Sequence, residues 1–171
     1  VRGSGWSGLA VDEARLMLTD GRPAHEVARA EGSARLALFD RPLVLPPAAG
    51  TALAYTVAGG AGEAWQAQAA AWLAALGFAP LPVADVPGLV VARTVAMLIN
   101  EAADAVLQGV CTPAGADAAM KLGVNYPAGP FEWLAQWDAR AVVALVDALD
   151  ATYRGERYRV SPWLRRQAGR G

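Results

Sequence analysis

The sequence predicts an α/β segment followed by an all-helical domain. Between residues 14 and 86, short apolar runs alternate with helical stretches, which is typical of a layer of strands and helices. From Pro87 onward, the long segments have apolar residues at helical spacing and carry proline or glycine near their ends. We therefore expect an α/β domain at residues 9–86 and a helical domain at residues 87–171.

The α/β segment is predicted to hold a small, partly parallel sheet. The runs "ARLMLTDG", "RLALFD" and "ALAYTV" are predicted strands, and "FAPLPVAD" is a last extended piece. A short helix is expected between Pro23 and Gly32, because proline suits a first helical turn and glycine can end a helix. A longer helix is expected within "EAWQAQAAAWLAALG", with the last residue of this segment, Gly77, just past its end. Residues 41–50, with three prolines, are predicted to form a loop.

The second half is predicted to contain four or five helices joined by tight turns. The segment from Leu89 to Gln108 has few polar residues, so we expect a central helix that is buried on most sides. Thr112-Pro113 predicts a helix start, and Gly123 is the expected end of that helix. The next long helix is expected to be capped by Asp138, and Ser161-Pro162 repeats the signal of a cap followed by proline.

Composition argues against several classes of partner. The 15 basic and 16 acidic side chains leave a net charge of −1, so no basic surface for nucleic acid or an anionic membrane is expected. The apolar run 89–107 carries Arg93, Asn100, Glu101 and Asp104, which argues against a membrane span. A single cysteine and the absence of a leader pattern predict a cytoplasmic protein.

No group of residues predicts catalysis or metal binding. The glycine cluster at residues 57–65 has Trp65 where a dinucleotide site needs a small residue, so we interpret it as an ordinary turn from strand to helix. His25 has no suitably spaced carboxylate on its own helix and is expected at the surface, and Cys111 is interpreted as an apolar filler. The polar side chains from Arg93 to Asp104 share one helix face, where they form either a structural network or part of a ligand site.

Residues 83–133, "VADVPGLVVARTVAMLINEAADAVLQGVCTPAGADAAMKLGVNYPAGPFEW", resemble the C-terminal domain of the 3-hydroxyacyl-CoA dehydrogenases. That family's pattern joins D-x-P-G, an arginine, N-E-A, D-x-A-M-x-x-G and P-x-G-P. The matching residues are Asp85, Pro87, Gly88, Arg93, Asn100, Glu101, Ala102, Asp117, Ala119, Met120, Gly123, Pro127, Gly129 and Pro130. The tail "GERYRVSPWLRRQA" is similar to the end of the long, two-module bacterial enzymes that act on 3-hydroxyadipyl-CoA in phenylacetate breakdown.

The resemblance implies a shortened Rossmann-like sheet followed by a helical domain of the 6-phosphogluconate dehydrogenase C-terminal type. It also implies that the chain is the C-terminal part of an NAD-dependent enzyme that oxidises 3-hydroxyacyl-CoA to 3-oxoacyl-CoA. In the family, NAD and the catalytic histidine belong to an N-terminal Rossmann domain, whose motifs do not occur in this sequence. We therefore expect no cofactor, catalytic residue or metal ligand in the chain itself. Ala92 replaces the asparagine that the family has before the arginine.

The turn "KLGVNYPAGPFEW" is interpreted as a rigid packing element. Pro127 and Pro130 fix φ, while Gly123 and Gly129 permit conformations and close approaches that other residues resist. In the family this turn fixes how two helices of the C-terminal domain pack against each other. That domain mediates dimerisation and forms a wall of the acyl-CoA cleft. The resemblance thus implies a homodimer, an acyl-CoA substrate and a partner Rossmann domain, and an independent interaction module without catalysis is the alternative. Candidate substrate-binding or interface residues are Arg93, Asn100, Glu101, Asn125, Tyr126, Pro127, Gly129 and Pro130.

Overall fold

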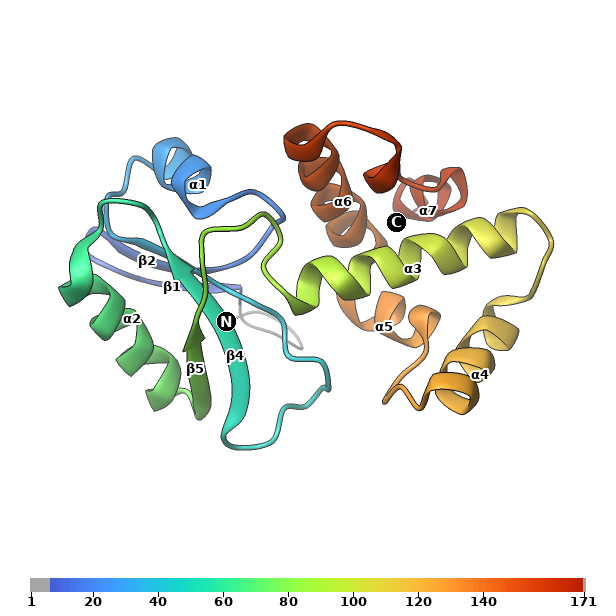
Figure 1. Ribbon diagram of the computed structural model, residues 1–171, viewed down its shortest axis with the longest axis horizontal. Helices are drawn as coiled ribbons and strands as arrows, with labels where there is room; N and C mark the ends of the chain where they lie inside the picture. Colours follow the sequence, from blue (N-terminus) through green and yellow to red (C-terminus); the bar gives the residue numbers. More distant parts are fainter. Residues whose placement is uncertain (1–6, 171) are drawn as a thin grey trace. The chain divides into compact units, whose positions relative to one another are not determined.

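The computed structural model describes residues 7–170. The chain divides into two compact units, Val1–Ala92 and Arg93–Gly171. The first unit contains a mixed sheet with helices, and the second consists of helices (Figure 1). The predicted order of an α/β part and a helical part is confirmed.

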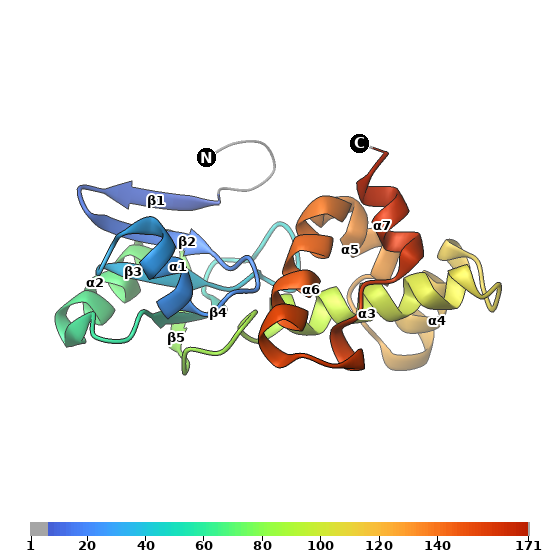
Figure 2. The same cartoon turned by 90° about the horizontal axis from the view of Figure 1, so that it is seen from above.

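The sheet has the strand order β1-β2-β3-β4-β5. Its strands are β1 (Gly8–Val11), β2 (Ala14–Leu18), β3 (Leu36–Phe39), β4 (Thr51–Val57) and β5 (Phe78–Pro82). The pairs β2–β3 and β4–β5 are parallel, and the pairs β1–β2 and β3–β4 are antiparallel. A small, partly parallel sheet is therefore confirmed. Strand β1, which the sequence did not predict, forms one edge (Figure 2).

The helices α1 (Ala24–Glu31) and α2 (Gly62–Ala75) cover opposite faces of this sheet (Figures 1 and 2). Successive residues of β3 point to different faces: Leu36 and Leu38 pack with Val27 of α1. Ala37 and Phe39 pack with Trp65, Ala69 and Leu73 of α2. This alternation follows from the two-residue period of a strand and explains why all of β3 is buried.

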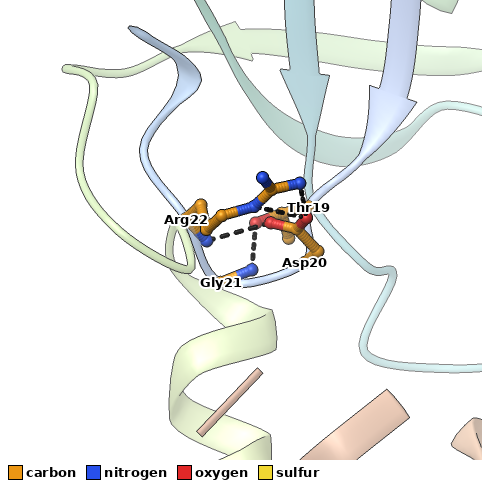
Figure 3. A network of polar contacts seen from close by, with 4 residues as sticks. All are labelled: Thr19, Asp20, Gly21 and Arg22. Carbon is orange, nitrogen blue, oxygen red and sulfur yellow. Dashed lines mark hydrogen bonds and ion pairs between the residues drawn. The ribbon is translucent and has the colours of Figure 1, made fainter. Parts of the chain in front are cut away.

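The loop between β2 and α1 is a tight polar turn. The Asp20 carboxylate accepts hydrogen bonds from the Arg22 backbone N–H at 3.0 Å, from its Nε at 2.9 Å and from its Nη2 at 2.6 Å (Figure 3). Gly21 adopts a φ of 102° and donates its N–H to the Thr19 hydroxyl. The predicted Asp-Gly turn is confirmed, and it leads directly into α1.

The N-terminus of α1 is capped by Asp85, which lies 61 residues further along the chain than Ala24. The Asp85 carboxylate accepts the backbone N–H groups of Ala24 at 2.6 Å and His25 at 3.0 Å. Its Oδ2 also lies 2.8 Å from Nδ1 of His25, whose side chain is half exposed. The expected surface histidine is confirmed, and its carboxylate partner comes from a residue 60 positions away in the sequence rather than from its own helix.

Asp40 caps the first turn of helix α3 (Val91–Leu107). Its side chain is fully buried at the end of β3, and its two oxygens accept four backbone N–H groups. The donors are Arg41 at 2.8 Å, Val90 at 2.9 Å, Val91 at 2.7 Å and Ala92 at 2.8 Å. Burial raises the pKa of Asp40, and the four N–H donors act in the opposite direction.

The second unit contains the rest of α3 and the helices that follow. These are α4 (Pro113–Val124), α5 (Pro130–Trp137), α6 (Ala139–Tyr153), the short 3₁₀ helix η1 (Glu156–Tyr158) and α7 (Pro162–Ala168). Helix α3 is crossed by α6 in both views (Figures 1 and 2). It buries the small face formed by Val95, Ala96, Ile99 and Ala103, while Thr94 and Glu101 are exposed. Of the 17 residues of α3 only Thr94, Glu101 and Leu107 are exposed, so the expectation of a helix that is buried on most sides is confirmed.

Two predicted helix caps are confirmed and two helix signals are corrected. The Thr112 hydroxyl accepts the Gly115 N–H at 3.1 Å, and the Asp138 carboxylate accepts the Arg140 N–H at 3.0 Å. Gly123 does not end α4, which continues to Val124, because Asn125 adopts the left-handed conformation at φ 57°. The expected cap by Ser161 is also wrong: α7 begins at Pro162, but the Ser161 side chain makes no capping bond.

None of the helices in residues 7–170 is long and apolar enough to cross a membrane.

Candidate functional site

The predicted site residues lie in two places within the helical unit. Arg93, Asn100 and Glu101 are on α3, and the remaining five residues, from Asn125 to Pro130, lie at the corner between α4 and α5. Of these residues, Arg93 and Glu101 line a pocket of the helical unit. The structure therefore separates the predicted residues into a pocket wall, a buried link and a corner.

Asn100 is a buried structural link. Its Nδ2 donates to the Arg159 carbonyl at 3.0 Å, and its Oδ1 accepts the Ser161 N–H at 2.8 Å. Arg159 also donates from Nη2 to Asp104 at 2.7 Å. These contacts tie α3 to the segment between η1 and α7, and both polar ends of the Asn100 amide are used. Of the two interpretations left open for the polar face, Asn100 and Asp104 fit the structural network.

The pocket, which we call the arginine pocket, has a volume of about 630 Å³. It lies between one face of α3 and the chain that runs from the end of α6 to η1. From α3 come Arg93, Met97, Leu98 and Glu101, and from the other side come Tyr153, Arg154, Arg157 and Tyr158. This volume is in the range of small-molecule sites in proteins.

The corner between α4 and α5 is held by side chains of both helices. Asp117 of α4 accepts the backbone N–H of Phe131 at 2.8 Å, in the first turn of α5. Glu132 of α5 reaches back to accept the Gly129 N–H at 2.9 Å and forms an ion pair with Lys121. This ion pair lowers the pKa of Glu132 and raises that of Lys121. The N–H groups that these carboxylates accept lie at the start of α5, where a helix leaves its first donors unpaired.

The other corner residues shape this turn. Asn125 takes the left-handed conformation that ends α4, and Tyr126 packs its ring at 5.9 Å from that of Trp133. Pro127 follows in the turn, and Pro130 occupies the first position of α5, where its missing N–H costs nothing.

Gly129 is required by a close approach rather than by its φ. Its φ of −84° is available to any residue. A Cβ at this position would overlap the Asp117 side chain, and Asp117 can move aside only by releasing the Phe131 N–H. Gly123, by contrast, sits inside helix α4, and a Cβ added there would have no atom within 4 Å.

The groups that resemble cofactor or catalytic sites have structural contacts instead. The glycine cluster forms the turn from β4 to α2, as predicted, and Trp65 is buried in the core below it. The N-terminus of α1, a position where a phosphate binds in many nucleotide folds, already holds the Asp85 carboxylate. In residues 7–170, no group of histidine, cysteine and acidic residues is arranged to hold a metal ion.

Sequence profiles of two domains match consecutive parts of the chain. The reduced Rossmann-fold domain of 3-hydroxybutyryl-CoA dehydrogenase matches residues 16–87. The C-terminal domain of 3-hydroxyacyl-CoA dehydrogenase matches residues 88–171. The chain belongs to the 3-hydroxyacyl-CoA dehydrogenase family. The resemblance inferred from the sequence and the Rossmann-like character of its first part are confirmed.

Named relatives of this dehydrogenase family are longer than the chain. The 3-hydroxyadipyl-CoA dehydrogenase of Escherichia coli is 38% identical over 159 residues, which are 92% of this chain and 32% of that protein. A probable 3-hydroxybutyryl-CoA dehydrogenase of Deinococcus radiodurans is 35% identical over 96 residues, covering 56% of this chain and 34% of the relative. The chain therefore spans about a third of the length of these relatives.

Solved structures share the fold. A crystal structure of 3-hydroxybutyryl-CoA dehydrogenase from Escherichia coli superposes with a TM-score of 0.86 and 34% identity, over 95% of this chain and 33% of that one. A (S)-3-hydroxybutyryl-CoA dehydrogenase from Ralstonia eutropha gives a TM-score of 0.74 at 24% identity, over 91% of this chain and 55% of that one. At that identity the second structure supports the fold alone.

The Gly129 contact predicts opposite effects for two glycine substitutions in this family member. Gly129→Ala should lower the free energy of unfolding by about 2 kcal/mol, and Gly129→Val by more, because the added carbons overlap Asp117. Gly123→Ala should leave the stability unchanged or raise it by about 0.5 kcal/mol, because alanine is favoured over glycine inside a helix. Urea unfolding of the two variants provides the measurement, and equal effects of both substitutions would contradict the contact.

Proposed function

We propose that this chain is the C-terminal part of a longer NAD-dependent 3-hydroxyacyl-CoA dehydrogenase, where it serves dimerisation and walls the acyl-CoA cleft. The observation that carries the proposal is the match of both domains, in order, to about a third of longer dehydrogenases. The parent enzyme would oxidise 3-hydroxyacyl-CoA to 3-oxoacyl-CoA, with NAD as the hydride acceptor. The two profiles meet between residues 87 and 88, which supports domains at 9–86 and 87–171.

The proposal assigns NAD binding and proton transfer to an N-terminal Rossmann domain outside these residues. Hydride transfer needs a base within reach of the hydroxyl and a nicotinamide held close to it. His25, the single histidine of the sequence, is half exposed and contacts a carboxylate that caps a helix. Asp40, although fully buried, has both oxygens engaged by backbone N–H groups. These contacts support a chain without a catalytic base or cofactor of its own.

The substrate class follows from the relatives by analogy. Because the Escherichia coli relative with 38% identity is a 3-hydroxyadipyl-CoA dehydrogenase, we place the parent enzyme in phenylacetate breakdown, a pathway related in chemistry to β-oxidation of fatty acids. The balanced charge and the single cysteine support a cytoplasmic enzyme without nucleic-acid or membrane partners.

The proposed dimer contact is supported by exposed apolar side chains of the helical unit. They occur at the end of α3, in the loop after it and on α4: Leu107 is 40% exposed, Val110 74%, Leu122 86% and Val124 55%. Exposed large apolar side chains of this kind favour association. The corner residues from Asn125 to Pro130 lie next to this surface in the sequence, and we assign them to the interface. Arg93 and Glu101, in the arginine pocket, are the proposed ligand-facing residues.

The assignment of NAD binding and proton transfer to the N-terminal domain predicts the result of an activity assay. The natural gene product that contains these residues should reduce NAD when given 3-hydroxyadipyl-CoA, and its intact mass should exceed that of this chain. The chain alone should show no NAD reduction and no heat of binding with NADH in calorimetry. Turnover by the isolated chain would contradict the proposal, and a gene product of the same mass as this chain would favour the independent interaction module.

Within the whole enzyme, Ala92→Asn should leave kcat nearly unchanged. Ala92 is fully buried and its N–H is held by Asp40, so circular dichroism must first establish that the variant folds. A large change in kcat with fold and dimer intact would mean that this module has an active site of its own.

Self-association should be measurable by sedimentation. We expect a dimer at tens of micromolar, because a two-fold arrangement is the simplest closed way to cover an apolar surface. Leu122→Glu should shift the equilibrium toward monomer, since Leu122 is largely exposed and its replacement leaves the core intact. The matched control is Ala144→Glu on the exposed side of α6, which should leave the dimer intact. A monomer of the unsubstituted chain at this concentration would contradict the expectation.

A further inference from the structure

The arginine pocket concentrates positive charge in a protein whose net charge is −1. Its lining residues include three arginines, Arg93, Arg154 and Arg157, and a single acidic residue, Glu101. The pocket therefore has an excess of two positive charges. Such an excess attracts anions and raises the free energy of an empty pocket.

The three arginines of the pocket form no ion pair, unlike four other cations of the described chain. Arg22, Lys121, Arg159 and Arg165 each form an ion pair with a carboxylate. Within residues 7–170, no carboxylate lies within ion-pair distance of Arg93, Arg154 or Arg157. The pocket is thus lined by three arginines without an ion-pair partner, which leaves their charge available to an external anion.

Two of these arginines are already positioned by aromatic neighbours. Arg93 donates from Nη1 to the Tyr153 hydroxyl at 3.3 Å, and the Arg157 guanidinium lies 5.5 Å from the centre of the Tyr158 ring. An ordered guanidinium loses less side-chain entropy when it binds an anion. The backbone at Arg154 is held at a φ of 50°, an uncommon conformation for a residue other than glycine, and strain of this kind concentrates at functional sites.

The same pocket has an apolar wall. Met97 and Leu98 of α3 are half-buried there, and the rings of Tyr153 and Tyr158 pack at 5.2 Å with a tilt of 30°. Tyr153 is 45% exposed, so part of its ring remains open to a ligand. A molecule that fits this pocket would combine an anionic head with an apolar or planar body.

We propose that the arginine pocket binds a small organic phosphate monoester, with its phosphate at the arginines and its apolar body on Tyr153 and Met97. A phosphate monoester carries a charge of roughly −1.5 to −2 at neutral pH, which matches the excess of two positive charges. A carboxylate monoanion would neutralise only half of it. Guanidinium groups bind phosphate oxygens through paired, charge-assisted hydrogen bonds. The inference deepens the assignment of Arg93 to a ligand-facing wall of the dehydrogenase, and its binding test needs no dehydrogenase activity, so either proposal can fail without the other.

Phenyl phosphate is the probe that combines both features of the proposed ligand. Calorimetric titration of the full 171-residue chain should show saturable binding of phenyl phosphate that weakens as ionic strength rises. Inorganic phosphate lacks the ring, phenol lacks the charge and benzoate has a single charge, so each should bind at least about tenfold more weakly. No saturable binding of phenyl phosphate, or equally tight binding of benzoate, would overturn the proposal.

Variants with one arginine neutralised test the location of the site. Arg93→Gln and Arg157→Gln should each weaken phenyl phosphate binding by about tenfold, because each removes a charge-assisted hydrogen bond. Arg166→Gln, at an exposed position outside the pocket, is the matched control and should bind like the parent chain. Circular dichroism should show the same fold for all three variants. A control that loses as much affinity as the pocket variants would overturn the assignment to this pocket.

Discussion

The carboxylate of Asp40 is the interaction on which the start of the long helix depends. Four backbone N–H groups converge on its two oxygens, and the side chain is completely removed from solvent. Each oxygen accepts two donors, an arrangement that suits an ionised carboxylate at a helix N-terminus. The residues around the start of α3 offer no local cap, because Gly88, Leu89 and Val90 have no side-chain acceptor. A distant acidic residue therefore performs what a serine or aspartate at the helix start would otherwise do.

The residues that carry the family resemblance act mainly as such contacts. Asp85 caps α1, Asn100 ties α3 to the segment before α7, and Asp117 caps α5. Gly129 leaves the space that Asp117 needs. The family pattern in this part of the sequence thus describes how helices are started and packed.

The elements that depend on local sequence were predictable, and the long-range contacts were not. Thr112 and Asp138 cap helices that begin within two residues of them, so a local pattern is sufficient to find them. The prediction that Gly123 ends α4 was wrong, because Asn125 also tolerates the left-handed conformation and ends the helix instead. Strand β1 is largely exposed along its length, so it lacks the alternation that reveals a strand. Three of the partners of Asp40 are about fifty residues away, and no local pattern reports such a pairing.

The candidate site was partly predictable for the same reason. Arg93 and Glu101 were found because they lie on one helix face, whereas Arg154 and Arg157 belong to the turn after α6 and meet them only in the folded unit. In the arginine pocket, three arginines have no ion-pair partner among the described residues. The buried polar groups elsewhere in the described chain are engaged mainly in caps and links between helices.

The central claim is that the buried polar residues of this chain hold structure rather than perform chemistry, and Asp40 is its most direct test. Asp40→Asn turns an amide NH₂ toward N–H donors and should lower the free energy of unfolding by about 3 kcal/mol. Asp147→Asn, which removes an exposed ion pair with Arg165, is the control and should cost about 0.5 kcal/mol or less. Urea unfolding decides: a loss for Asp40→Asn no larger than that of the control would contradict the account.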